Sequence, residues 1–249
     1  MSREGPLWPV LDTADAERLG GKAMRLGQVL LLSLLLSCAI VESADSQTGS
    51  AEATPAISEL VREVSRSAVG VISGPPIPAA EGASFGSGFV VDAENGMVLT
   101  AAHLIGDPHT ISVLDNAGSV RHATIIALDE SLDLALVRVD GRFESALSFA
   151  SAAPQAGQEA FAVGRIVDGR TLCVGQGIVS AVVHSPMDAL MLSFPLQRGM
   201  SGAPVVNARG EVIGIASAVA SRASGALAPF GFAMPSATVQ TWLSSTKRQ

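Results

Sequence analysis

Three residues of this sequence have the types and the order needed to make a serine hydroxyl reactive. His103 ends the segment 100–103, Asp133 directly precedes an apolar run, and Ser201 lies beside Gly202 before another apolar run. A serine hydroxyl is a weak nucleophile unless a base within hydrogen-bond reach removes its proton. A histidine can be that base, and an aspartate can fix the tautomer of the histidine. The order therefore predicts acyl transfer with Ser201 as nucleophile, His103 as base and Asp133 as the partner of His103.

A glycine two residues before this serine has a predicted role in the same reaction. Gly199 has no Cβ, so the backbone can turn there until its N–H and that of Ser201 point at one oxygen. Such a pair of donors forms an oxyanion hole, and loss of one donor typically lowers turnover by ~10²–10³. A glycine-flanked serine alone is typical of an ordinary turn. The prediction therefore depends on finding His103, Asp133 and Ser201 together.

The other titratable residues have simpler interpretations. Asp129 and Glu130 are interpreted as solvated loop charges, and Asp133 is preferred because only it directly precedes the apolar residues 134–137. The remaining histidines are interpreted as half-buried structural side chains: His109, His122 and His184. The four histidines and two cysteines show no metal-ligand spacing, so we expect no metal and no other cofactor.

Composition narrows the class of protein. The 249 residues carry a formal net charge of −7 with 16% charged residues, which argues against a nucleic-acid partner. Aromatic residues are 4% with no tyrosine, so Val, Leu, Ile and Ala must build the core. Cys173 is the only cysteine outside the N-terminal apolar run. We expect it to be a small buried hydrophobic residue with no intrachain disulfide.

The N-terminal region contains the features of a secretory signal. Residues 29–41 are almost all apolar, Arg25 precedes them, and small or polar residues follow. This run is shorter than the ~20 apolar residues that a membrane-spanning helix needs. Acidic residues oppose the basic ones before Met24, so both Met1 and Met24 are candidates for the start of the protein.

Three fates of this segment are open, and all place the rest of the chain outside the cytoplasm. The signal is cleaved near Ala39 or Ser43, or Cys38 is lipidated at a lipobox-like sequence, or the signal is retained as an anchor. We expect a periplasmic or secreted protein whose membrane attachment, if any, is a lipid at Cys38 or an uncleaved signal. Residues 1–44 are assigned to this extension, 45–55 to a flexible linker and 56–249 to the folded domain.

The pattern of residues 56–249 is typical of an all-β protein. Short apolar runs, often β-branched, alternate with Gly, Pro, Asn and Asp. About a dozen strands predict two six-stranded antiparallel β-barrels, and the lack of amphipathic helices between them argues against a parallel α/β sheet. The expected strands are 69–72, 88–91, 98–101, 110–114, 123–127, 135–139, 160–163, 177–183, 190–194, 203–206, 212–216 and 231–234.

A short helix is expected at each end of this domain. Thr54 and Pro55 suit an N-cap and a first-turn proline, and apolar residues at helical spacing continue to about Ser65. Residues 235–245 have the spacing of a closing helix.

The chain resembles the trypsin-like serine proteases, and more closely their HtrA/DegP branch. The resemblance covers about residues 56–247 and is carried by five segments. These are the glycine-rich strand (86–91), the histidine segment (98–103), the aspartate motif (133–135), the nucleophile hairpin (201–207 with 210–215) and the final strand (231–236). It implies that Leu196 lines the primary specificity pocket, with core packing as the alternative. It also implies that Ile215, Ala216 and Ser217 add the substrate backbone to a strand edge.

The sequence departs from the family pattern at three points. Met200 stands where the HtrA branch usually has Asn and the digestive enzymes Asp, so activation by an N-terminal ammonium is not expected. Ala203 replaces the second glycine after the serine, which adds a methyl group near the expected oxyanion hole. The chain also ends just past the closing helix, so no PDZ domain is expected.

The resemblance implies a serine endopeptidase that hydrolyses protein or peptide substrates through an acyl-enzyme, in extracytoplasmic protein quality control. A leucine in a shallow pocket favours small aliphatic residues before the scissile bond. The alternative, motivated by Met200 and Ala203, is an inactive protease fold that binds peptides or acts as a chaperone-like module. A membrane-attached structural lipoprotein is a further alternative that only Cys38 supports.

Overall fold

The computed structural model describes residues 56–74, 84–106, 110–166, 169–184, 188–217 and 230–246. All of them belong to one compact unit, which spans Thr54–Gln249. The predicted signal, Cys38, the linker 45–55 and His109 lie outside these ranges. None of the helices in the described ranges has the length and hydropathy needed to cross a bilayer.

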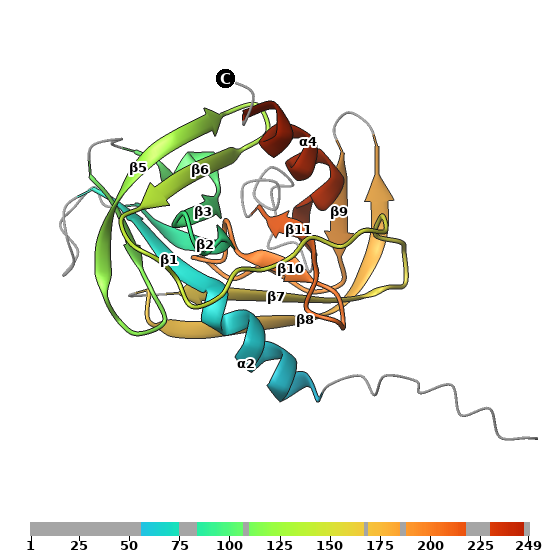
Figure 1. Ribbon diagram of the computed structural model, residues 1–249. Helices are drawn as coiled ribbons and strands as arrows, with labels where there is room; N and C mark the ends of the chain where they lie inside the picture. The colour runs from blue at the N-terminus through green and yellow to red at the C-terminus, as the bar shows by residue number, and fades with distance from the viewer. Residues whose placement is uncertain are drawn as a thin grey trace, which may run out of the picture. The chain divides into compact units, whose positions relative to one another are not determined.

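The first six strands form a closed antiparallel barrel with the order β1-β2-β3-β6-β5-β4 (Figure 1). The 3₁₀ turn Ala102–Leu104 directly follows β3. Alternate residues of these strands point into the barrel, where valines and isoleucines form a core cluster that includes Val71, Val98 and Val137. The strands are β1 (Ala68–Ser73), β2 (Ser84–Asp92), β3 (Met97–Thr100), β4 (Ile111–Leu114), β5 (Val120–Asp129) and β6 (Leu134–Val139).

The remaining six strands form a second closed barrel with the order β10-β11-β12-β9-β8-β7. The prediction of an all-β fold with two six-stranded antiparallel barrels is confirmed. The strands are β7 (Glu159–Ile166), β8 (Thr171–Val183), β9 (Ala189–Leu192), β10 (Pro204–Val206), β11 (Val212–Ala216) and β12 (Gly231–Pro235).

The strand β8 begins six residues earlier than the predicted start at residue 177. Its glycines look like strand breakers in the sequence, but here they make room for an aromatic ring. An ideal Cβ on Gly175 or Gly177 would lie 2.6 or 2.8 Å from ring carbons of Phe194. The two glycines thus allow the ring of Phe194, which is 6% exposed, to lie directly on the strand.

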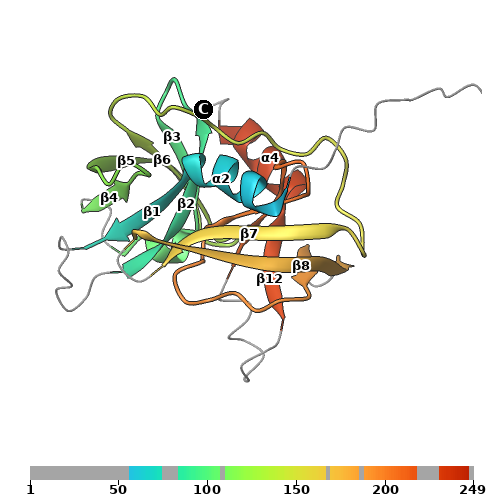
Figure 2. The same ribbon diagram turned by 90° about the horizontal axis from the view of Figure 1, so that it is seen from below.

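A helix lies at each end of the described unit, as expected. The helix α2 (Ile57–Ser67) contacts β7 and β1 (Figure 2), and its buried side includes Leu60 and Val64. Ala56 occupies its N-cap position without a side-chain cap, so the prediction of an N-cap at Thr54 was wrong. The helix α4 (Ser236–Thr246) buries Val239 and Trp242.

One hydrophobic cluster joins the two barrels and both helices. Side chains from α2, β2, β6, β7, β11 and α4 meet in it, and Phe89 of β2 is fully buried there. The ring of Phe89 meets Phe149 edge to face with centroids 6.3 Å apart. Because residues of both barrels share this cluster, each barrel depends on the other for part of its core.

Truncating this aromatic residue is expected to weaken the whole unit. Phe89→Ala should lower the free energy of unfolding by about 3–5 kcal/mol, because it leaves a cavity where two barrels meet. Ile126→Ala, at a side chain 41% exposed on β5, is the control and should cost less than about 1 kcal/mol. Urea unfolding followed by circular dichroism measures both values. Equal losses for the two variants would contradict a shared core at Phe89.

Candidate active site

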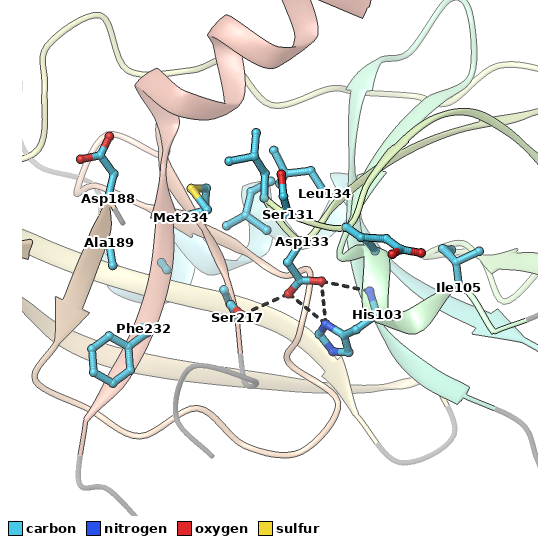
Figure 3. Close-up of a pocket in the computed structure, with 16 residues that line it drawn as sticks. His103, Ile105, Ser131, Asp133, Leu134, Asp188, Ala189, Ser217, Phe232 and Met234 are labelled. Atoms are coloured by element: carbon cyan, nitrogen blue, oxygen red, sulfur yellow. Dashed lines mark hydrogen bonds and ion pairs between the residues drawn. The ribbon is translucent and has the colours of Figure 1, made fainter. Parts of the chain in front are cut away.

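His103 and Asp133 are brought into contact from different parts of the first barrel. His103 lies in the 3₁₀ turn after β3, and Asp133 lies in the turn that joins β5 to β6. The ring Nδ1 of His103 is 2.9 Å from each carboxylate oxygen of Asp133, and the His103 backbone N–H donates to Oδ1 at 2.9 Å. The hydroxyl of Ser217 donates to Oδ2 at 3.2 Å (Figure 3). With the proton on Nδ1, this arrangement leaves Nε2 as an acceptor.

The turn before Asp133 is organised by a second aspartate. One carboxylate oxygen of Asp129 accepts hydrogen bonds from the Ser131 hydroxyl at 2.6 Å, and from the N–H groups of Ser131 and Leu132 at 3.0 Å. The Ser131 hydroxyl is the main reason that the pKa of Asp129 lies below its ordinary value, followed by the Leu132 N–H. Asp129 is thus a turn-forming residue, a role that the sequence analysis did not assign to it.

Asp133 itself has an unusual backbone conformation. Its φ is +56°, and among the described residues no other non-glycine residue has a positive φ. An aspartate enters this left-handed region at lower cost than most residues, and such strain persists only where the surroundings hold it. The bonds from His103 and Ser217 on one side and the Asp129 turn on the other provide these restraints.

Ser201 lies in the loop that precedes β10 and is 5% exposed. Gly199 and Gly202 on either side have φ values of +97° and +81°. The space beside Gly202 is filled by the first barrel, because an ideal Cβ there would lie 2.7 Å from Thr100 Oγ1 and 3.0 Å from Ala101 N. These are the residues just before His103. Close packing at Gly202 therefore brings the serine loop against the segment that carries the histidine.

Two backbone donors at this loop are unpaired within the described part of the chain. The N–H groups of Gly199 and Ser201 donate to no described residue, whereas those of Met200, Gly202 and Ala203 all have backbone acceptors. The same ranges contain no hydrogen bond between Ser201 Oγ and His103 Nε2. Such bonds are often long in unliganded sites and tighten when substrate binds.

The two residues that depart from the family pattern are buried. Met200 and Ala203 are both fully buried and belong to the core cluster of the second barrel. The methyl group of Ala203 lies opposite Gly164, where an ideal Cβ would be only 3.0 Å from it. The extra methyl group is therefore accommodated by a glycine of β7.

Leu196 packs against the core of the second barrel. It is half-buried beside Gly231, where an ideal Cβ would lie 2.8 Å from Leu196 Cγ. This position is compatible with both interpretations of Leu196, as a pocket residue and as a core residue.

The predicted substrate-binding edge is occupied by the protein itself. Ile215 is paired with Pro204 of β10 and with Met234 of β12, and the N–H of Ala216 donates to Ala203. The prediction of strand addition at Ile215 and Ala216 was therefore wrong, because β11 is interior in a closed barrel. Barrel neighbours cannot be identified from one apolar run.

Ser217 lies just beyond this paired stretch. Its N–H donates to Phe232 at 2.9 Å, but no described residue donates to its carbonyl. Of the three residues of the predicted edge, Ser217 alone retains a backbone acceptor for an incoming chain.

A cavity of about 570 Å³ opens beside the His103–Asp133 pair. Figure 3 shows the pair on one side and Asp188, Ala189, Phe232 and Met234 across from it. Most of its wall is apolar, with Ile105, Leu132, Ala189, Ile215, Phe232 and Met234 among the lining residues. Glu130 and Asp188 add carboxylates, and Asp188 is 3.1 Å from the His184 ring. No local pattern in the sequence indicates this cavity, because its walls come from five separate segments.

Cys173 and the distribution of possible metal ligands bear on cofactor chemistry. Burial raises the pKa of the Cys173 thiol, which lies against the core of the second barrel and forms no disulfide. Within the ranges that the structure describes, no group of His, Cys, Asp and Glu side chains has an arrangement suited to a metal ion.

Comparison with known proteins gives the same assignment by three routes. Residues 86–215, just over half of the chain, match the family described as trypsin-like peptidase domain. Serine protease HTRA1 of Xenopus tropicalis is 32% identical over 181 residues, which cover 68% of this chain and 37% of that protein. The crystal structure of the serine endoprotease from Yersinia pestis is similar with a TM-score of 0.67 at 26% identity, covering 78% of this chain and 68% of that one.

The name of a second sequence relative includes a cellular location. The Pseudomonas fluorescens protein named "probable periplasmic serine endoprotease DegP-like" is 36% identical over 161 residues, which cover 62% of this chain and 33% of that protein. The chain thus spans about a third of the length of these two sequence relatives. With the family match and the shared two-barrel structure, these similarities show that the chain belongs to the trypsin-like peptidase family and is related to the serine proteases of the HtrA/DegP group.

Proposed function

We propose that this protein is an active serine endopeptidase in which Ser201, His103 and Asp133 form the catalytic triad. The observation that carries the proposal is the bond from His103 Nδ1 to Asp133, which leaves the other ring nitrogen free as a base. Two N–H groups without a described partner, those of Gly199 and Ser201, supply the oxyanion hole. The family match and the serine protease relatives support the same reaction.

The acylation step follows from these positions. Nε2 of His103 takes the proton of Ser201 as Oγ attacks the substrate carbonyl carbon, and the carbonyl electron pair moves onto its oxygen. The N–H groups of Gly199 and Ser201 donate to that oxyanion. Asp133 stabilises the protonated ring of His103, which then gives its proton to the leaving amine nitrogen as the C–N bond breaks.

Hydrolysis of the acyl-enzyme reuses the same groups. A water molecule attacks the ester carbon while His103 takes one of its protons, and the oxyanion is again held by Gly199 and Ser201. When the C–O bond to Ser201 breaks, His103 returns the proton to Oγ and the enzyme is regenerated. No step uses a metal or another cofactor.

The substrate is a protein or peptide segment that enters beside His103. The carbonyl of Ser217 accepts a hydrogen bond from the substrate backbone, and the cavity next to Asp133 receives an apolar side chain. The carboxylates of Glu130 and Asp188 make this cavity unfavourable for acidic substrate residues. Leu196 lines the pocket for the residue before the scissile bond and favours small aliphatic side chains there.

We place this activity outside the cytoplasm, in protein quality control. The N-terminal apolar run and the periplasmic name of the Pseudomonas relative support this location. The alternative function is an inactive protease fold that binds peptides. The departures from the family pattern at Met200 and Ala203, both buried beside the serine loop, motivate that alternative.

Labelling with a fluorophosphonate separates the two functions. An active enzyme should form a covalent adduct at Ser201 and hydrolyse an unstructured protein such as casein. Ser201→Ala or His103→Ala should each lower hydrolysis by roughly 10⁵–10⁶, because the triad acts as a unit. His122→Ala is the control, at an exposed histidine on β5, and should keep the wild-type rate. Absence of a Ser201-dependent adduct, with the fold intact by circular dichroism, would support the inactive peptide-binding module.

Truncating Leu196 tests its assignment to the specificity pocket. Leu196→Ala should raise kcat/KM for peptides with Leu before the scissile bond by about tenfold or more relative to peptides with Ala there, because the pocket becomes larger. Val182→Ala is the control, because Val182 packs against the same core cluster. Both peptides are assayed with all three proteins. If Leu196→Ala lowers both rates by the same factor, as Val182→Ala does, Leu196 is a core residue.

A further inference from the structure

Ser87 of β2 contacts the serine loop through both its side chain and its backbone. We propose that Ser87 is a positioning residue for the oxyanion hole, acting from the first barrel on a loop of the second. Ser87 is fully buried and therefore inaccessible to substrate, so its effect must pass through Gly199 and Ser201. This inference rests on the proposed function, because it concerns the geometry of that same site.

The hydroxyl of Ser87 holds the peptide that lies between the two proposed oxyanion donors. It donates to the Gly199 carbonyl at 2.7 Å and accepts the Arg165 N–H at 2.8 Å. The Arg165 carbonyl oxygen also lies 3.0 Å from the hydroxyl oxygen. The hydroxyl has a single proton to donate, and the shorter distance assigns that proton to the Gly199 carbonyl. The other end of the Gly199–Met200 peptide is held as well, because the Met200 N–H donates to Gln197 at 3.0 Å. This peptide plane is therefore fixed at both its polar atoms.

The backbone of Ser87 binds the nucleophile residue itself, at the carbonyl of Ser201. Its N–H donates to the Ser201 carbonyl at 2.8 Å, so one residue binds the carbonyls of both residues whose N–H groups face the oxyanion. The two carbonyls point toward β2 of the first barrel because Ser87 binds them there. This fixes the backbone angles of Gly199 and Ser201, and at these angles their own N–H groups have no partner among the described residues. Rotation of the Gly199–Met200 peptide would break the hydroxyl bond to Ser87.

The position of Ser87 is itself rigid. Its carbonyl accepts the Thr100 hydroxyl at 2.7 Å, and Gly164 of β7 approaches so closely that an ideal Cβ there would lie 2.9 Å from Ser87 Oγ. Arg165 of β7 is 6% exposed, and its side-chain Nε–H donates to the Ala68 carbonyl of β1 at 3.0 Å, which holds β7 against the first barrel. Deleting the hydroxyl thus leaves the Gly199 carbonyl without its donor in a packed, dry environment.

Ser87→Ala removes the bonds of the hydroxyl to the Gly199 carbonyl and the Arg165 N–H, and it keeps the backbone bond to Ser201. Because it weakens the positioning of a donor without removing the donor, kcat should fall by roughly 10–100-fold, less than the full loss of an oxyanion-hole donor. KM should stay within about twofold. The inhibition constant of a peptide aldehyde, which places an oxyanion in the hole, should rise together with the fall in kcat.

Ser67→Ala is the matched control. Ser67 is 1% exposed and its hydroxyl bonds to the Ser145 hydroxyl at 2.8 Å, so the change deletes a buried hydroxyl that makes no hydrogen bond to the described serine loop. It should change kcat and the aldehyde constant by less than about twofold. Should Ser87→Ala fail to fold, Ser87→Cys fills the site with a somewhat larger thiol that donates only weakly, and the same loss in kcat is expected.

The outcomes distinguish this inference from the proposed function. An active wild-type enzyme whose kcat and aldehyde binding are unaffected by both Ser87 variants would overturn the positioning role and leave the triad standing. Equal losses in Ser87→Ala and Ser67→Ala would also overturn it, because they would report a general loss of stability. A folded wild-type protein that neither labels at Ser201 nor cleaves casein would overturn both proposals.

Discussion

The close approach of backbone to backbone along the seam between the two barrels is the constraint on which the site depends. His103 and Asp133 belong to the first barrel and Ser201 to a loop of the second, so the reactive groups meet only if the barrels touch there without intervening side chains. An ideal Cβ on Gly202 would lie 2.2 Å from the Ser87 carbonyl oxygen. A side chain at this position would push the serine loop away from the histidine segment.

Burial and hydrogen bonding act on this seam in different ways. The shared hydrophobic cluster holds the barrels together but has no direction, so it does not fix the orientation of a single peptide group. Hydrogen bonds do fix it, and at the seam they come mainly from β2 and β7. Met200 illustrates the division, because its side chain lies in the apolar core while its N–H binds Gln197. The loop is thereby anchored by packing and oriented by polar contacts.

The sequence predicts the strands well because period-2 apolar patterning and turn residues act locally. All twelve strands occur near their expected positions, and the largest difference is at the start of β8. The early start of β8 was missed because Gly175 and Gly177 serve the ring of Phe194, which is distant in the sequence. The start of α2 was misplaced because Ala56 occupies the N-cap position without a capping side chain.

The site is predictable only in part, because local sequence patterns do not show which distant segments become neighbours. The contact between His103 and Asp133 was expected from residue types and order, and the structure has it. The interior position of β11, the turn built on Asp129 and the bonds of Ser87 all depend on which segments become neighbours in space. A single sequence does not contain that information in any local pattern.

The closure of both sheets has a consequence for how readily the folded protein associates with other chains. β1 pairs with β4 in the first barrel and β7 with β10 in the second, so neither sheet has a terminal strand whose whole outer row of N–H and C=O groups is open. Such rows are where β-proteins associate edge to edge and begin to aggregate. A folded molecule of this kind offers other chains no full-length strand edge to join.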